Sequence, residues 1–304
     1  MLRYILSRLG QSVLVMFGVS LLIFYSLHLT GDPAAVMMPP GSSQAEIAHF
    51  RQAMGFDQPL LWQYGHYLNA VLHGDLGQSL RYDQPVTELI VQRVPATLLL
   101  AVTALAWSTI VGVLLGLVSA IWRNSFMDLL ARLLAFSGQA IPVFWLGLLM
   151  ILLFSLQLRW LPSSGYGSAS QLIMPAISLG AYYMSAIARL VRASLIDVLH
   201  LDYLRTAQAK GLSQWRILIR HGLRNALIPV VTVQGMYFAS LLGGALVTEI
   251  IFAWPGIGRL AVQAIQNRDF PLVQAIVLLA ALVFVVVNLL IDLLYVVLNP
   301  RIRL

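Results

Sequence analysis

The chain has 304 residues, of which 59% are hydrophobic and 10% are charged, and its mean hydropathy is +0.82. Because soluble globular domains carry about 25% charged residues, this composition excludes a soluble domain, a disordered chain and a coiled coil. A net charge of +7 would suggest nucleic-acid binding in a soluble protein. In an inner-membrane protein it is explained by the Lys and Arg that collect in cytoplasmic loops. The absence of cysteine excludes disulfides, thiolate metal sites and cysteine nucleophiles.

Apolar stretches long enough to cross a hydrocarbon layer of about 30 Å occur six times. They lie at 9–29, 97–122, 133–158, 172–191, 226–252 and 273–298. The fourth is the weakest because Pro175, Gly180 and Arg189 interrupt it. The first lacks a small-residue cleavage site after it, so we predict an uncleaved helix. The predicted fold class is an all-α integral membrane protein with six transmembrane helices.

Basic residues divide unequally between the two sides of this bundle. With the N-terminus inside, thirteen lie on the inner side (Arg3, Arg8, Arg123, Arg132, Arg189, Arg192, Arg205, Lys210, Arg216, Arg220, Arg224, Arg301, Arg303) and six on the outer side (Arg51, Arg81, Arg93, Arg159, Arg259, Arg268). Because translocation of positive charge is disfavoured, we predict that both termini are cytoplasmic. The predicted domains are the N-terminus and first helix (1–30), an external cap (31–96) and a transmembrane core (97–304).

The predicted external cap is polar and rich in proline. Apolar residues at helical spacing predict short amphipathic helices at 45–54 and 60–72. A lid packed on its own bundle is favoured over a binding domain. A second external stretch, 253–272, contains the turn Trp254-Pro255-Gly256.

The cytoplasmic segment 192–225 is basic and helix-forming, and it is broken only at Gly211. A short alanine-containing helix that ends at a glycine suits insertion into a groove of another protein. The arginines equally suit a helix lying on lipid headgroups. The residues alone leave both interpretations open.

Catalytic and metal-binding motifs are absent from the sequence. There is no P-loop, no H-E-x-x-H motif and no nucleophile elbow, and the six histidines lack ligand spacing. We therefore predict no enzyme activity, no metal site and no cofactor in this chain. Among ionisable groups in apolar stretches, Glu249 is expected to pair beneath the 254–256 turn and Asp292 to hold helices together. Arg189 and Arg192 are expected to extend to the inner interface.

Small residues at four-residue spacing mark close helix contacts. They are Gly112 and Gly116 in the second predicted span and Gly235, Ala239 and Gly243 in the fifth. Because six helices enclose little central space, a wide solute pathway is easier to build at an interface with a second subunit. The small-residue face of the fifth helix is the predicted lining.

Motifs spread along the whole chain carry a resemblance to a known family. The exit of the fifth helix, 248–260, reads TEIIFAWPGIGRL, and the other motifs are GDPA at 31–34, HGDLG at 73–77, RLVRAS at 189–194, RNALIP at 224–229 and NPRIR at 299–303. Together they resemble the permeases of peptide and nickel ABC importers. The long loop after the first helix is similar to the B-type permease of the two that pair in these importers.

The resemblance implies a coupling helix that docks on a partner ATPase. It comprises Tyr203, Arg205, Thr206, Ala207, Ala209, Lys210, Gly211 and Leu212. The chain departs from the family's Glu-Ala-Ala signature, since Arg205 and Thr206 stand where Glu and Ala would and Arg224 replaces a proline; peptide-type permeases depart similarly. Gly235, Ala239, Gly243, Glu249 and Asp292 are assigned to the pathway or helix packing, and Trp254, Pro255 and Gly256 to an external gate or docking site.

The function implied is half of a translocation pathway in a bacterial inner membrane. The implied partners are a second, C-type permease, two cytoplasmic P-loop ATPases that bind ATP and Mg, an external solute-binding protein and membrane lipid. ATP-driven closure would pass through the coupling helix as a rigid-body switch. Dipeptides, oligopeptides, glutathione, nickel and metal chelates stay open as substrates. The alternative is a self-contained secondary transporter, for which inverted repeats and intramembrane carboxylates are expected and only Asp292 is a deep carboxylate.

Overall fold

The computed structural model describes residues 2–29, 32–38 and 41–298, and these residues are helical with no strand beyond one isolated bridge between Gln78 and Pro85. The helices are α1 (Leu2–Leu29), α2 (Pro33–Met37), α3 (Gln44–Ala53), α4 (Leu60–Leu72), α5 (Val86–Ile121), α6 (Phe126–Ala140), α7 (Val143–Met150), the π-helix η1 (Ile151–Gln157), α8 (Ala169–Leu199), α9 (Asp202–Ala209), α10 (Gln214–Arg216), the π-helix η2 (Ile217–Leu223), α11 (Arg224–Ala226), α12 (Ile228–Gly244), α13 (Leu246–Ile251), α14 (Ile257–Gln266) and α15 (Phe270–Leu298). The predicted all-α class is confirmed.

Four continuous helices are long and apolar enough to cross a membrane, over Ser7–Ser26, Val86–Ile121, Ala169–Leu199 and Phe270–Ile291. Two bent pairs, Phe126–Ala140 with Val143–Gln157 and Gln214–Ala226 with Ile228–Gly243, bring the number to six if each pair is one span. The continuous helix predicted over 133–158 is wrong, because the chain bends there by 106°. The bend lies at Ile141 and Pro142, where proline disfavours helical geometry in the residue before it.

The stretch that looks weakest in the sequence forms the most buried of the long helices. α8 runs beyond the predicted 172–191 at both ends, and 67% of its most apolar window is buried inside the protein. A Cβ atom added at Gly180 would lie 2.7 Å from the carbonyl oxygen of Ala104 on α5. Small and polar residues are tolerated in α8 because other helices, rather than lipid, surround it.

The chain divides into two compact units, one formed by Met1–Pro95 with Gly256–Leu304 and the other by Ala96–Pro255. The division at Pro95 falls inside α5, and the first unit joins 256–304 to the N-terminal part. The division into an external cap and a transmembrane core stays a prediction. Residues 86–96, predicted as cap, already belong to α5.

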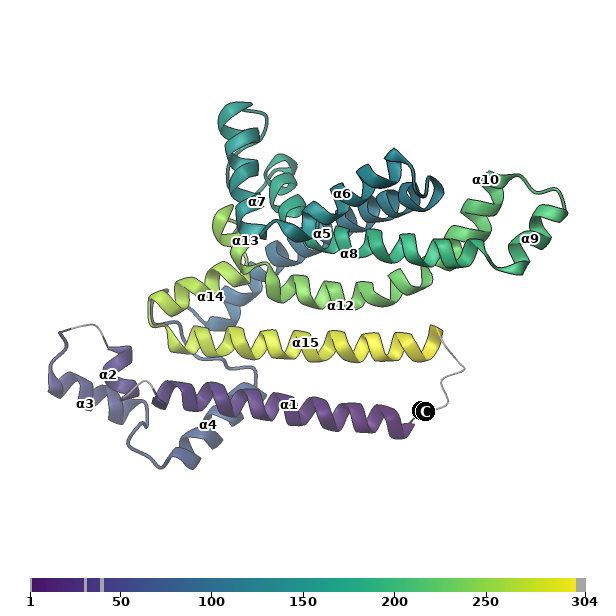
Figure 1. The fold of residues 1–304 in the computed structure, drawn as a ribbon. Coiled ribbons are helices and arrows are strands. Elements are labelled where there is room, and N and C mark those ends of the chain that lie inside the picture. The colour runs from purple at the N-terminus through teal and green to yellow at the C-terminus, as the bar shows by residue number, and fades with distance from the viewer. Residues whose placement is uncertain (1, 30–31, 39–40, 299–304) are drawn as a thin grey trace. The chain divides into compact units, whose positions relative to one another are not determined.

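In the first unit, α1 packs against α15 (Figure 1). The cap helices predicted at 45–54 and 60–72 are confirmed as α3 and α4, and Ser43 with Glu46 forms a capping box at the start of α3. Arg51 pairs with Asp32, and its hydrogen bond lowers the pKa of that carboxyl. The buried Asp269, at the start of α15, accepts a hydrogen bond from Ser79. Capping and paired charges thus hold the loops of this unit.

In the second unit, glycines let helices approach α8 closely. A Cβ atom added at Gly112 or Gly116 of α5 would lie 2.8 or 2.6 Å from a carbonyl oxygen of α8, and one added at Gly138 of α6 would lie 2.4 Å from another. The close contact predicted for Gly112 and Gly116 is therefore confirmed. Gly243 of α12 differs, since a Cβ atom there would meet no atom within 4 Å.

Two glycine variants separate close packing inside the chain from open space. Gly116→Leu forces α5 away from α8 and should destabilise the purified chain by about 3 kcal/mol, the upper range for overpacking a tight contact. Gly243→Leu fills open space and should leave the stability of the isolated chain within about 0.5 kcal/mol. Unfolding in detergent micelles measures both, and equal stabilities for the two variants would contradict this account of the packing.

Candidate functional site

The short helix α9 ends at Gly211, as the sequence predicts. The N–H of Gly211 donates to the carbonyl of Gln208 at 2.9 Å, and that of Leu212 donates to the carbonyl of Ala207 at 3.3 Å. These are the two hydrogen bonds of a Schellman motif. Gly211 has φ +80°, a left-handed conformation that glycine adopts without steric cost. The end of the helix is therefore sharply defined.

α9 is tied to the helices that follow it by one tyrosine. The hydroxyl of Tyr203 donates to the carbonyl of His221 at 3.1 Å and accepts from Nδ2 of Asn225 at 2.7 Å. Leu204 is buried beneath the helix, whereas Ala207 is half-buried. The remaining predicted coupling residues are solvent-exposed, apart from the half-buried Leu212: Arg205, Thr206, Ala209, Lys210 and Gly211. α9 therefore presents a surface that nothing in the described chain covers.

The expectation that Gly211 alone breaks the cytoplasmic segment is wrong. The chain also breaks at His200 and Leu201, which separate α8 from α9. Asp202, directly after this break, lies in the first turn of α9, where a carboxylate interacts favourably with the helix dipole. α9 is thus an independent short helix joined to the end of α8 by two residues.

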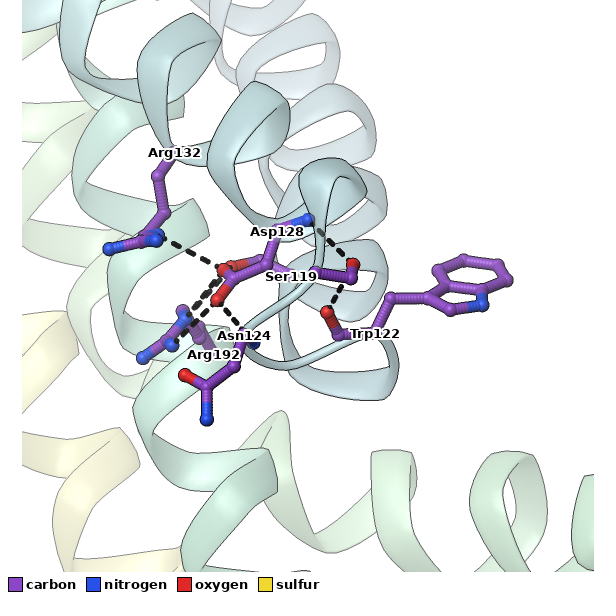
Figure 2. Close-up of polar contacts among 7 residues, drawn as sticks. Ser119, Trp122, Asn124, Asp128, Arg132 and Arg192 are labelled. Atoms are coloured by element: carbon purple, nitrogen blue, oxygen red, sulfur yellow. Dashed lines mark hydrogen bonds and ion pairs between the residues drawn. The ribbon is translucent and has the colours of Figure 1, made fainter.

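A buried carboxylate joins three helices near the end of α8 (Figure 2). Asp128 of α6 is fully buried, and its oxygens lie 3.1 Å from Nε of Arg132 and 3.3 Å from Nη2 of Arg192 on α8. It also accepts hydrogen bonds from the hydroxyl of Ser119 on α5 and from the backbone N–H of Asn124 at 3.0 Å. Nε of Arg192 donates to Ser119 at 2.8 Å. We call Ser119, Asp128, Arg132 and Arg192 the Asp128 cluster.

Sequence reasoning missed the Asp128 cluster, because Asp128 resembles an ordinary acid in the first turn of a helix. The one signal in the sequence is that this acid begins an apolar helix and is followed four residues later by Arg132. Arg192, expected to extend to the inner interface, instead turns into the protein, because a buried carboxylate needs a charged partner. Arg189, one turn earlier on α8, is exposed as expected.

The predicted gate residue Trp254 lies in the core rather than on a surface. Its side chain is 1% exposed, and its indole N–H donates to the carbonyl of Ala96 at 2.8 Å. The ring of Tyr166 packs edge-on against it, and Ala253 has φ +50°. The indole therefore holds the turn in place and offers no docking surface in this structure. Pro255 is half-buried and Gly256 is buried.

Glu249 lies beneath this turn, as expected from the sequence. Its carboxylate is fully buried and accepts a hydrogen bond from Oγ1 of Thr97 at 2.7 Å, while its backbone carbonyl accepts from the N–H of Trp254 at 2.8 Å. Glu249 thus connects α13 to α5. Asp292 lies in α15, but its side chain is outside the described residues.

Within the described part of the chain, the small-residue face of α12 is only partly covered. Gly235 and Ala239 are half-buried and Gly243 is exposed. Among the described residues, no group of three or more His, Asp or Glu side chains is placed to hold a metal ion.

Comparison with known proteins gives a match over nearly the whole chain. Residues 112–304 match the family described as binding-protein-dependent transport system inner membrane component, and residues 1–101 match the N-terminal region of such components. The glutathione transport system permease protein GsiC of Escherichia coli is 44% identical over 304 residues, covering 100% of this chain and 99% of that protein. GsiC of Salmonella typhimurium is 45% identical with the same coverage.

Two solved structures share the fold at low sequence identity. An amino acid ABC transporter crystallised with histidines matches with a TM-score of 0.54 and 16% identity, covering 68% of this chain and 93% of its own. The MetNI methionine ABC transporter in inward-facing conformations matches with a TM-score of 0.53 and 19% identity, covering 67% and 95%. With the family match and the full-length relatives, these likenesses confirm the predicted resemblance: the chain belongs to the binding-protein-dependent transport system inner membrane component family, as a permease subunit of a bacterial ABC importer in the inner membrane.

Proposed function

We propose that this permease carries glutathione or a closely similar short peptide, as one half of a translocation pathway. The observation that carries the proposal is the end-to-end match, at 44–45% identity, to permeases of glutathione transport systems. Such a match covers the pathway helices and the cap together. Nickel and metal chelates are less well supported, since the described residues provide no metal-binding group. Family membership also decides against the alternative of a self-contained secondary transporter.

Energy enters this chain through α9. With both termini cytoplasmic, α9 lies on the cytoplasmic side, where two P-loop ATPases binding ATP and Mg would dock. Its Schellman end and the Tyr203 hydrogen bonds give it a fixed shape, and its exposed face is small enough to enter a groove. This favours the groove interpretation over the lipid-surface interpretation.

Movement of α9 reaches the membrane helices through α8. Only His200 and Leu201 separate the two helices. The Asp128 cluster then fixes the end of α8 to α5 and α6, because separating Arg192 from Asp128 would leave a buried charge unpaired. A push on α9 is therefore expected to move these three helices together rather than slide one past the others.

The pathway itself needs a second, C-type permease. The small-residue face of α12, with Gly235, Ala239 and the exposed Gly243, is the surface we assign to it. An external binding protein would deliver the solute to the opposite side of the membrane.

The assembled importer tests the proposed function directly. Affinity purification of this chain from native membranes should recover a second permease and ATPase subunits, and the reconstituted complex with its binding protein should accumulate labelled glutathione only with ATP. Gly243→Leu should lower recovery of the second permease, since it adds bulk to the surface assigned to that subunit.

Each outcome of this experiment has a defined meaning. Uptake of a dipeptide such as dialanine with no uptake of glutathione would overturn the proposed substrate while leaving the importer intact. Recovery of the second permease at wild-type yield with Gly243→Leu would remove α12 from the subunit contact. The isolated chain with the same substitution, which should fold normally, is the control.

Ala207→Glu tests the docking of α9. The substitution adds bulk and charge to the half-buried face of the helix, so uptake should fall about tenfold or more, as at a well-packed contact between proteins. The chain should still insert and assemble with the second permease. Ala48→Glu, which adds the same group to the exposed face of the cap helix α3, should leave uptake unchanged. Normal ATP-driven uptake by Ala207→Glu would contradict the coupling role.

Asp128→Asn tests the link between α8 and its neighbours. The amide keeps the shape of the carboxylate but removes the charge that holds Arg192 and Arg132, so the solute transported per ATP hydrolysed should fall. Asp57→Asn is the matched control, because Asp57 is exposed and belongs neither to α9 nor to the Asp128 cluster. Equal transport ratios for wild type and Asp128→Asn, in complexes of equal yield, would show that the cluster does not transmit motion.

A further inference from the structure

A cavity of about 390 Å³ opens beside the Asp128 cluster, between α5, α6 and α8. Three arginines line it, Arg132 from α6 and Arg189 and Arg192 from α8. The remaining wall is mostly apolar and includes Leu115 and Phe136. A cavity that combines guanidinium groups with an apolar wall fits a ligand that has an anionic head and a hydrocarbon body.

The charges around this cavity do not cancel. Asp128 is the one carboxylate that contacts its arginines among the described residues, so three positive groups face one negative group. Arg189 has no carboxylate partner in the described part of the chain. Arg132 contacts Asp128 through Nε, is 54% exposed, and keeps its Nη hydrogens for another acceptor. The cavity therefore retains guanidinium donors that can bind a phosphate, for which their planar fork is well suited.

Aromatic and apolar residues next to the cavity indicate its depth in the membrane. Trp122, in the turn between α5 and α6, is 51% exposed and points away from Arg132 and Arg192 (Figure 2). Tryptophan is enriched at the level of the lipid headgroups. Further along α6, Leu133 and Phe136 are exposed, as expected for a helix surface in contact with acyl chains. With Trp122 at the headgroup level, the arginines would lie at the level of lipid phosphates, and the apolar wall would continue into the hydrocarbon layer.

We propose that this cavity binds an anionic phospholipid of the inner leaflet, with the phosphate on Arg189 and Arg132. Arg192 is held by Asp128 and positions the other groups. The uncancelled positive charge selects anionic over zwitterionic headgroups, because each basic residue adds attraction toward an anionic lipid. The bound lipid would fill the space between α6 and α8 next to the link that carries motion from α9. The proposal concerns this chain whatever solute the importer carries.

Native mass spectrometry of the complete importer tests the site, with phosphatidylglycerol and phosphatidylcholine titrated separately. Wild type should retain phosphatidylglycerol in preference to phosphatidylcholine. Arg189→Gln breaks no ion pair, so the protein should fold, and phosphatidylglycerol binding should weaken about fivefold, the effect of one basic residue near an anionic surface. Arg189→Lys should restore most of this binding. Arg123→Gln is the matched control, since Arg123 lies in the α5–α6 turn but does not line the cavity.

Three results would overturn the proposal. An equal loss of phosphatidylglycerol binding with Arg123→Gln would mean a general surface attraction and no site. Displacement of the lipid by millimolar inorganic phosphate would identify a site for a soluble anion. A lipid that binds the isolated chain but is lost in the complete importer, with no effect of Arg189→Gln there, would mean that another subunit covers the cavity.

Discussion

A single buried charge joins three helices in the part of this permease that we propose receives mechanical force. Asp128 has no exposed surface, and a carboxylate buried without a partner is too costly to persist. Its carboxylate oxygens interact with four groups: Ser119 of α5, the backbone N–H of Asn124 in the turn that follows α5, Arg132 of α6 and Arg192 of α8. A requirement for charge compensation therefore holds α5, α6 and α8 at one point, beside the apolar packing of Ala120 on α5 against Leu195 on α8.

Apolar packing alone would hold these helices less specifically, because lipid tails compete equally well for apolar side chains. The structure uses two other devices in the second unit. Gly112, Gly116 and Gly180 let α5 and α8 approach backbone to backbone, and Glu249 binds Thr97 near the other end of α5. Close contact along the helices and a polar bond toward each end together produce a group of helices that can move as one body.

Sequence patterns predicted the features that depend on local chemistry. The cap helices α3 and α4, the end of α9 at Gly211 and the glycine contacts of α5 follow from amphipathic spacing, left-handed glycine geometry and small-residue spacing. Features that depend on distant partners were missed. The burial of Trp254 and the pairing of Arg192 with Asp128 depend on partners 64 or more positions away in the sequence. The 106° bend at Pro142 is a turn, and hydrophobic periodicity does not encode the angle of a turn. The low hydropathy of α8 made it look like the weakest membrane span. Hydropathy reflects contact with lipid, whereas most of α8 contacts other helices of the protein.

The proposed sites of this permease are surfaces and links between helices. A subunit that receives work from a partner needs a rigid element to take up the force, and under the proposed function α9 with its fixed ends would supply it. It would also need a compact route inward, for which we propose α8 and the Asp128 cluster, and a face for a second subunit, for which we propose α12. The arginines of this region have two roles. Arg132 and Arg192 are bound to Asp128 and hold the helices together, whereas Arg189 has no carboxylate partner among the described residues and can bind a lipid. Because Arg189 and Arg192 lie within one turn of α8, a lipid in the cavity and a force that arrives through α9 would act on the same stretch of helix.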